Sequence, residues 1–279
     1  MTATATVVSA QAAEAYRTTV KPIWCPGCGH YGALAGLSRA MAVMNAPAET
    51  TALISGIGCS SRLPAYMTPY GFHGVHGRAL PFAIGLKLAR PDLSVIAVGG
   101  DGDGYAIGGN HFLHACRRNV DLAYVVLDNR VFGMTKGQPS PTTEPDWDSP
   151  MQPGGTNMPM FDPVAIALAA GANFVARGHS GDPNALAEMI VAAVEWPGFA
   201  LVEVLSPCVA FRPEETEWKR LVHPGKGFPT SDRAQAVALA AADPFGTGIV
   251  FRGPLTRPQA RLPLEQQGDL KSVETEFAA

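Results

Sequence analysis

The stretch SVIAVGGDG, residues Ser94–Gly102, decides the fold class of this chain. Five residues read as a buried strand, and two glycines and an aspartate follow at its C-terminal end. The run does not alternate between polar and apolar side chains, so both faces of the strand are expected to be covered. A helix predicted at about Gly108–Arg118 separates this strand from the next apolar run. This order of elements indicates a parallel sheet with helices on both faces, a doubly wound α/β fold.

Three other apolar runs lead into polar or cysteine-containing turns in the same way. They are TALIS (Thr51–Ser55) before Gly56–Ser61, LAYVVL (Leu122–Leu127) before Asp128-Asn129, and FALVEVL (Phe199–Leu205) before Pro207-Cys208. Ligands of such sheets collect at the carboxyl ends of the strands. We therefore expect Cys59, Asp101, Asn129 and Cys208 to meet at one rim of the sheet.

Asp101 and Asn129 are suited to hold a divalent cation beside a diphosphate. Mg²⁺ takes oxygen ligands and binds substrate phosphates with only one or two protein carboxylates. Gly100 and Gly102 would let the backbone come close to phosphate oxygens. An isolated Gly-Asp-Gly is usually only a turn. Here a strand precedes it, a helix follows, and a second strand ends in Asp-Asn, so a cofactor site is the better interpretation.

The five cysteines indicate metal or redox chemistry rather than a disulfide framework, because their number is odd. Cys25 and Cys28 form a Cys-x-x-Cys pair in the turn WCPGCGH, while Cys59 and Cys208 lie in separate loops. Four thiolates are a common ligand set for an iron–sulfur cluster. A structural zinc ion could use the same residues, although such sites usually pair two Cys-x-x-Cys turns. Cys116 follows a helical pattern and is expected in the core.

Histidines and cations near these motifs are weaker candidates. His76 precedes the predicted helix Arg78–Leu88, and helix N-termini bind phosphate. His73 is as easily a structural residue as a ligand. Arg62 and Lys136 are the cations nearest to the cofactor motifs in the sequence. Either could bind a carboxylate, and for both a solvated charge is nearly as good an interpretation.

The composition excludes several classes of function. The net charge of −3 gives no electrostatic reason to bind nucleic acid or an anionic membrane. No apolar run approaches the roughly 20 residues of a membrane span. Residues Met1–Val20 lack the basic start and apolar block of a secretory signal, so we expect a cytoplasmic protein with an N-terminal arm over residues 1–20.

The charged fraction of only 16% predicts that part of the surface is covered by another chain. We expect one α/β domain over residues 21–228 and an extension over residues 229–279 that has no core of its own. The extension is expected to pack on a partner subunit. Its apolar side chains would otherwise be exposed; they are Phe251, Leu255, Leu262 and Leu264.

Ordered motifs between Trp24 and Pro213 resemble the β subunit of 2-oxoacid:ferredoxin oxidoreductases, and most of all its 2-oxoglutarate branch. The segments that carry the resemblance are WCPGCGHYG, GIGCSSR, HGRALPFAIGLKLARP, GGDGDGYAIGGNHFLHACRRN and LDNRVFGMTKGQPSPTT. The resemblance implies a thiamine diphosphate-binding α/β domain that also carries one 4Fe–4S cluster.

The resemblance also implies roles for individual residues. Cluster ligation falls to Cys25, Cys28, Cys59 and Cys208, and Mg²⁺ ligation to Asp101, Asn129 and the Val131 carbonyl. Contacts to thiamine diphosphate are implied for Ile57, Gly58, Cys59, Ser60, His76, Gly100, Gly102, Asp103, Gly133 and Met134, beside Asp101 and Asn129. Arg62 and Lys136 match positions near the 2-oxoacid or coenzyme A.

The implied activity is the coenzyme A-dependent oxidative decarboxylation of a 2-oxoacid, such as 2-oxoglutarate to succinyl-CoA and CO₂, or the reverse reaction. Electrons would pass through the cluster to ferredoxin. The aminopyrimidine-binding half of the thiamine site would belong to an α subunit, in a heterodimer or a dimer of heterodimers. Pyruvate or broad 2-oxoacid specificity, a non-redox thiamine-dependent decarboxylase or carboligase, and a zinc-stabilised scaffold subunit are the alternatives.

Overall fold

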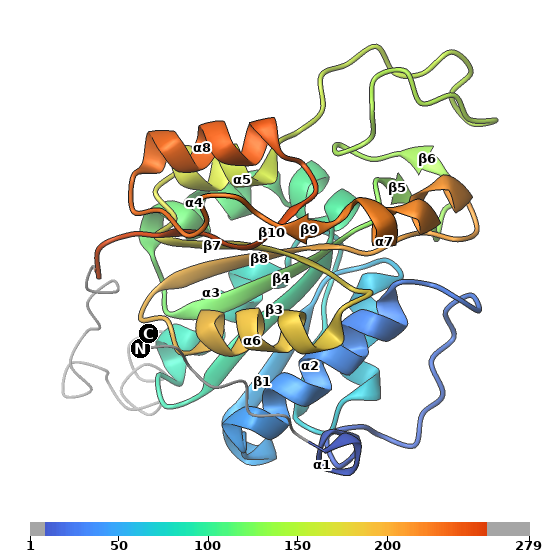
Figure 1. Ribbon diagram of the computed structural model, residues 1–279. Coiled ribbons are helices and arrows are strands. Elements are labelled where there is room, and N and C mark those ends of the chain that lie inside the picture. The colour runs from blue at the N-terminus through green and yellow to red at the C-terminus, as the bar shows by residue number, and fades with distance from the viewer. Residues whose placement is uncertain (1–8, 256–279) are drawn as a thin grey trace, which may run out of the picture.

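An eight-stranded sheet forms the centre of the computed structural model, which describes residues 9–255 (Figure 1). The strand order is β2-β1-β3-β4-β8-β7-β10-β9, and all neighbours are parallel except β10 and β7. The strands are β1 (Thr51–Ser55), β2 (Tyr70–His73), β3 (Ser94–Gly100), β4 (Leu122–Asp128), β7 (Phe174–His179), β8 (Phe199–Leu205), β9 (His223–Pro224) and β10 (Gly246–Arg252). A separate two-stranded ribbon pairs β5 (Val131–Phe132) with β6 (Gln138–Pro139). The prediction of a mostly parallel sheet is confirmed.

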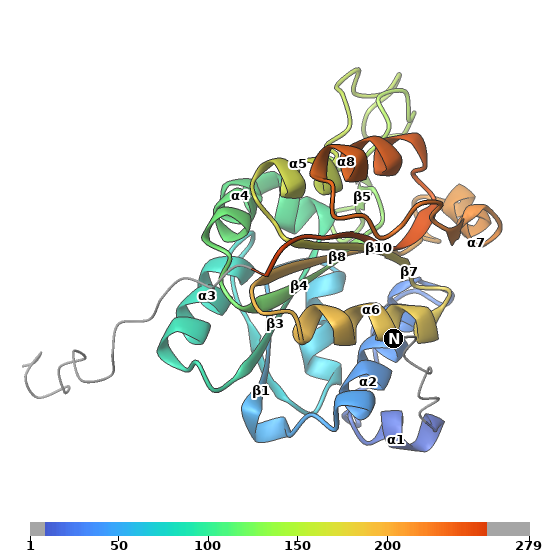
Figure 2. The same ribbon diagram turned by 60° about the vertical axis from the view of Figure 1, so that its left-hand side comes forward.

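Helices cover both faces of this sheet (Figures 1 and 2). One face carries α1 (Ala10–Glu14), α2 (His30–Met44) and α6 (Pro183–Val194). The other carries α3 (Ala79–Ala89), α4 (Gly109–Arg118), α5 (Pro163–Ala169) and α8 (Arg233–Ala242). Shorter turns complete the list: the 3₁₀ helices η1 (Ala48–Thr50), η2 (Ser60–Tyr66) and η4 (Pro213–Glu217), the π-helix η3 (Gly102–Ile107), and α7 (Trp218–Leu221). No helix within residues 9–255 is long and apolar enough to cross a membrane.

Apolar strands that lack alternation fill two cores at once. In β4, Val125 packs into the core beneath α2 and α6, and its neighbour Val126 packs into the core beneath α3, α4 and α5. Side chains alternate between the faces of a strand, so both sets must be apolar when both faces are covered. Each such side chain contributes about 1.5–3 kcal/mol relative to full exposure. This is why the long apolar runs could be recognised as central strands.

The C-terminal part of the described chain differs from the prediction. Residues 229–252 were expected to lie outside the domain, but α8 packs beside α5 and β10 joins the sheet beside β7. Phe251 is 1% exposed, so it belongs to the core of this chain and needs no partner to cover it. Leu255 is exposed, as expected. Leu262 and Leu264 lie outside the described residues.

The topology explains where a ligand site can form. After β1 the chain builds β2 on one side, and it then returns to build β3 on the other side of β1. Loops leaving the carboxyl ends of β1 and β3 therefore diverge and leave a crevice, which is the usual ligand position in such sheets. The loops after β4 and β8 reach the same edge, beside β5 and β6 in Figure 1.

Candidate cofactor site

Two adjoining cavities lie at the carboxyl edge of the sheet. The first, called here the rim cavity, has a volume of about 130 Å³. Its walls come from the loops after β1, β2, β3 and β4. It brings together all of the predicted diphosphate and magnesium contacts: Ile57, Gly58, Cys59, Ser60, His76, Gly100, Asp101, Gly102, Asp103, Asn129, Val131, Gly133 and Met134.

Three oxygen-bearing groups converge in this cavity. One terminal position of the Asn129 amide lies 3.3 Å from Asp101 Oδ1 and 2.8 Å from the Val131 carbonyl oxygen. An amide nitrogen there would donate hydrogen bonds to both oxygens. An amide oxygen there would leave three oxygens facing one another, as they do around a cation. Oxygens bound 2.1 Å from Mg²⁺ at right angles are about 3.0 Å apart, so the residues fit an octahedral magnesium site.

Two glycines leave the backbone of the rim cavity without side chains. A Cβ on Gly102 would lie 2.2 Å from the ring of Phe132, which leaves no room for any side chain. Gly58 has a φ of +117° and nothing within 4 Å of its Cβ position. An L-residue is strained at that φ, and a side chain there would have open space around it. The backbone of these loops can therefore approach a phosphate directly.

Asp103 binds the protein itself. Its Oδ1 accepts hydrogen bonds from the backbone N–H of Ile57 (2.9 Å), the backbone N–H of Gly77 (2.7 Å) and Nδ1 of His76 (2.6 Å). Because Nδ1 is bonded to this carboxylate, His76 has only Nε2 left for a ligand. The loops after β1 and β2 are thus held to the segment after β3 by one side chain.

Asp101, which lines the rim cavity, is linked through Thr142 to a second buried carboxylate, Asp128. The Thr142 hydroxyl is 3.1 Å from Asp101 Oδ2 and 2.8 Å from Asp128 Oδ1, and it has one proton to donate. Burial, followed by the charge of Asp101, raises the pKa of Asp128 to about 7. Burial also raises the pKa of Asp101. The charge of Arg130 opposes this effect on Asp128, and a divalent cation beside Asp101 would lower both pKa values further.

The second cavity is lined by four cysteines and is called here the cysteine cavity. It has a volume of about 160 Å³, and Cys25, Cys28, Cys59 and Cys208 all line it. A Cβ on Gly133 would lie 3.8 Å from the Cys208 sulfur and 3.9 Å from the Cys59 sulfur, so both sulfurs face the same point. Burial raises the pKa of Cys28 to about 12, and the other three thiols add to this effect. Thiolates gathered in this way need a positive group to stabilise them.

Aromatic packing holds the Cys-x-x-Cys turn against the other loops. Trp24 donates from Nε1 to the Cys59 carbonyl oxygen at 2.7 Å, and its ring makes edge contacts with His30 and Tyr66. His30 is fully buried, bonds through Nδ1 to Ser206 Oγ at 2.8 Å, and lines the rim cavity. Burial lowers the pKa of His30 to about 4, so it is neutral at pH 7. The sequence did not single out His30, although it directly follows the Cys-x-x-Cys turn.

The arrangement of the cysteines does not suit a single zinc ion. Within residues 9–255, no group of three or more His, Cys, Asp or Glu side chains could hold one metal ion. The four thiolates of a 4Fe–4S cluster bind four separate iron atoms and are therefore farther apart than the ligands of one metal ion. Four cysteines around one cavity fit a cluster better. Cys116 is 0% exposed in α4, which confirms its prediction as a core residue.

The remaining candidates are separated by their positions. Arg62 is half-buried and lines the cysteine cavity, and its Nε has no hydrogen-bond partner within the described chain. Lys136 is exposed with a φ of +89° and lines neither cavity. His73 is exposed at the end of β2 and also lines neither.

The two cavities share a wall. Cys59, Asn129, Gly133 and Met134 line both of them. A group in the cysteine cavity and a group in the rim cavity would therefore lie directly beside each other.

The fold and the rim cavity define a thiamine diphosphate-binding domain. Residues 56–204 match the family model described as thiamine pyrophosphate enzyme, C-terminal TPP binding domain. This range contains the loops after β1, β2, β3 and β4 that form the cavity. The match therefore agrees with the position of the site.

Similar proteins of known name indicate which kind of thiamine diphosphate-binding protein this chain resembles. The chain is 36% identical over 268 residues to the β subunit of 2-oxoacid:ferredoxin oxidoreductase 1 of Aeropyrum pernix, with 89% of this chain and 83% of that protein covered. It is 48% identical over 188 residues to 2-oxoglutarate oxidoreductase subunit KorB of Mycobacterium tuberculosis, a match that spans 67% of this chain and half of that relative.

A solved structure agrees over almost the whole chain. The structure is a 2-oxoglutarate:ferredoxin oxidoreductase from Magnetococcus marinus with 2-oxoglutarate, coenzyme A and succinyl-CoA bound. The two share 38% identity with a TM-score of 0.84, and 96% of this chain and 91% of that one are covered. The chain belongs to the family of 2-oxoacid:ferredoxin oxidoreductase β subunits.

Proposed function

We propose that this chain is the thiamine diphosphate- and cluster-binding subunit of an enzyme that decarboxylates a 2-oxoacid oxidatively onto coenzyme A, or runs the reverse reaction. The shared wall between the rim cavity and the cysteine cavity carries the proposal. A non-redox thiamine enzyme would have no use for four cysteines beside its diphosphate site. A scaffold subunit would have no use for the converging oxygens of the rim cavity.

Each cofactor has a defined place in the proposal. Asp101, Asn129 and the Val131 carbonyl would hold Mg²⁺, and the rim cavity would hold the diphosphate. Cys25, Cys28, Cys59 and Cys208 would hold one 4Fe–4S cluster. When bound, thiamine diphosphate supplies a carbanion-stabilising ring and the cluster accepts single electrons.

The residues of this chain bind, orient and exclude water. Asp103 fixes the His76 ring, so that Nε2 is the nitrogen available to a diphosphate oxygen. Ile57, Phe132 and Met134 line the rim cavity with apolar side chains, which would help to keep water from the reacting atoms once cofactor and partner are bound. Arg62 would bind a substrate carboxylate at the edge of the cysteine cavity. Lys136 would reach substrate only if its exposed loop moves inward.

We propose 2-oxoglutarate as the substrate, because the Magnetococcus structure has this 2-oxoacid bound. Arg62 offers a cation to one carboxylate, and 2-oxoglutarate has a second carboxylate that pyruvate lacks. Pyruvate or a broad range of 2-oxoacids is the alternative. A panel of 2-oxoacids with coenzyme A and a low-potential acceptor distinguishes them, since 2-oxoglutarate should show the highest kcat/KM.

A partner subunit is part of the proposal. The described chain offers a diphosphate site and one α/β unit, so a second chain would hold the aminopyrimidine ring. Such a chain would dock over Ile57 and Met134, which line the rim cavity and are exposed; Val75, the residue before His76, is also exposed. Ferredoxin would take the electrons from the cluster.

The decisive experiment is anaerobic purification of the chain together with its partner. Iron and acid-labile sulfide should approach four of each per chain for a 4Fe–4S cluster. Activity should require coenzyme A, the partner and thiamine diphosphate. Zinc in place of iron, or full 2-oxoacid oxidation by the isolated chain, would contradict the proposal.

A further inference from the structure

We propose that Arg212 is a positioning residue that fixes the cysteine cavity against the turn Asn129–Val131, so that each cofactor strengthens the binding of the other. The inference rests on the proposed function for the identity of the two cofactors. Arg212 itself lines neither cavity, and its side chain is 4% exposed.

The backbone of Cys208 is held from both sides by the turn that contains Arg212. The Arg212 N–H donates to the Cys208 carbonyl oxygen at 2.9 Å. The Cys208 N–H donates to Glu215 Oε2 at 3.0 Å, and the Glu215 N–H donates to the Arg212 carbonyl oxygen at 3.0 Å. Both polar backbone groups of Cys208 are therefore satisfied within this turn, which fixes its backbone and the direction of its Cα–Cβ bond.

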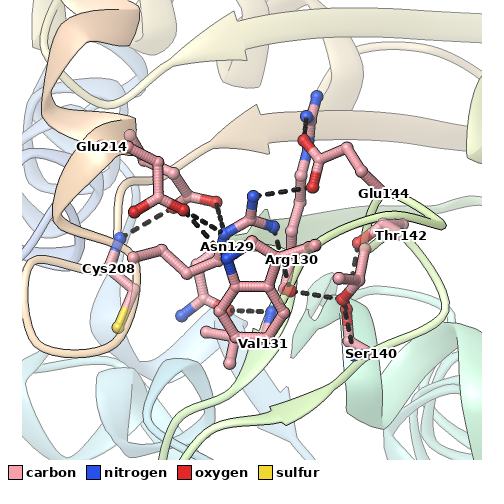
Figure 3. Close-up of polar contacts among 12 residues, drawn as sticks. Asn129, Arg130, Val131, Ser140, Thr142, Glu144, Cys208 and Glu214 are labelled. Atoms are coloured by element: carbon pink, nitrogen blue, oxygen red, sulfur yellow. Dashed lines mark hydrogen bonds and ion pairs between the residues drawn. The ribbon is translucent and has the colours of Figure 1, made fainter. Parts of the chain in front are cut away.

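The Arg212 side chain reaches from this turn to the loop after β4. Its guanidinium donates to Glu144 Oε2 at 2.7 Å and to the Arg130 carbonyl oxygen at 3.4 Å, and it stacks 4.7 Å from the Trp147 ring centre. Glu144 also pairs with the Arg130 guanidinium. Arg212 Nε also donates to Glu214 Oε1 at 3.0 Å, and Figure 3 shows this network, with Cys208 and Glu214 on one side and Arg130 and Glu144 on the other. Arg212 therefore joins the two loops through two contacts, one to Glu144 and one to the Arg130 carbonyl oxygen.

Arg130 is the point at which this network acts on the magnesium-binding turn. It stands between Asn129 and Val131 and has a φ of +52°, a left-handed conformation that side chains rarely adopt. Such a conformation persists when its surroundings over-determine it. Here the carbonyl oxygen of Arg130 accepts bonds from Thr143 and Arg212, and its N–H donates to Asp128 at 2.9 Å. Because the left-handed residue lies between them, it sets how the Asn129 amide and the Val131 carbonyl face each other.

A link of this kind has a thermodynamic signature. If the cluster orders the Cys208 turn, and Arg212 transmits that order to Asn129 and Val131, the cluster must tighten thiamine diphosphate binding. The cofactor must then tighten cluster binding by the same factor. A buried ion network that only stabilises the fold would lower the unfolding temperature when cut, without producing such coupling.

The test measures cofactor binding with and without the cluster, on the full chain purified anaerobically with its partner. Calorimetry gives the Kd of thiamine diphosphate in the presence of Mg²⁺, before and after removal of the cluster by an iron chelator. Removal should weaken binding about tenfold in the wild type, within the usual range of coupling between sites. In Arg212→Met the two Kd values should agree within about twofold, and the iron content should fall.

Two further variants keep the test decisive. Glu144→Gln removes the negative charge that Arg212 and Arg130 share but leaves the Cys208 turn intact, so it should weaken the coupling and keep the iron; it decides the matter if Arg212→Met does not fold. Arg177→Met is the control, because Arg177 is also buried, pairs with Glu203 at 2.8 Å and lines neither cavity. It should lower stability and keep the coupling.

The outcomes separate the two proposals. A wild-type complex without cluster or thiamine binding overturns the proposed function. A wild-type complex that binds both without coupling overturns the inference and leaves the function standing. Coupling that survives in both Arg212→Met and Glu144→Gln overturns it in the same way.

Discussion

Replacing Gly56 by alanine tests whether Asp103 organises the rim cavity. A Cβ at Gly56 would lie 2.1 Å from Asp103 Oδ2 and 2.6 Å from Oδ1. Carbon and oxygen atoms that are not bonded need about 3 Å or more, so the carboxylate must move by about 1 Å. Such a shift is expected to lengthen two of the three bonds to Ile57, Gly77 and His76 beyond hydrogen-bond range.

The expected loss follows from these bonds. Each hydrogen bond to a carboxylate contributes about 1.5 kcal/mol, so losing two of the three costs about 3 kcal/mol. In a domain of this size that corresponds to a fall in unfolding temperature of roughly 10 °C. Ile57 and His76 line the rim cavity, so the affinity for thiamine diphosphate should fall at least about tenfold.

The assay is thermal unfolding followed by circular dichroism, together with calorimetric cofactor binding. Gly85→Ala is the matched control, because Gly85 lies in α3 with nothing within 4 Å of its Cβ position. Alanine is favoured over glycine in a helix by about 0.5–1 kcal/mol, so this variant should be slightly more stable than the wild type. Wild-type unfolding and binding in Gly56→Ala would refute the role given to Asp103.

Three further predictions concern other parts of the chain. Cys208→Ser should abolish the visible cluster absorption and Cys116→Ser should keep it, so full absorption in the first variant would contradict the ligand set. Asn129→Ala should weaken Mg²⁺-dependent thiamine diphosphate binding about 100-fold by calorimetry, with iron content unchanged, if the amide is a metal ligand worth about 2.7 kcal/mol. Burial lowers the pKa of His179, so the unfolded chain binds a proton more readily than the folded chain and stability should fall as pH drops below about 6.5. Urea unfolding at pH 7.5 and 5 should show a smaller fall for His179→Gln, and an equal fall would rule out this source.

Strands could be predicted where both faces are apolar. Residues 94–100, 122–128 and 199–205 have long apolar runs, and the structure has strands there. The strand β7 was missed because Arg177 stands in its middle, where burial is possible only through its pairing with Glu203. The strand β10 was missed because Gly246 and Gly248 weaken its pattern.

Some residues of the candidate site could also be predicted from the sequence, and others could not. Cys59, Asp101 and Asn129 could be found because each follows a strand that the pattern reveals. Thr142 and Arg212 could not be found, since they act through contacts with residues 41 and 68 positions away in the sequence. Neither a local period nor a spacing rule reports such contacts. They depend on how the long loop after β5 folds back over the end of β4.

The π-helix after β3 has a consequence for how the length of this chain can vary. In η3 the Gly108 N–H reaches back five residues to the Asp103 carbonyl, and α4 begins directly after it. Deleting one residue between positions 102 and 107 would let this turn relax into an ordinary α-helix, whose hydrogen bonds are better formed. The same deletion would rotate Asp103 by about 100° relative to α4 and carry its carboxylate away from Ile57 and Gly77. A single-codon deletion here is therefore expected to give a more regular helix and a protein that no longer closes its diphosphate site.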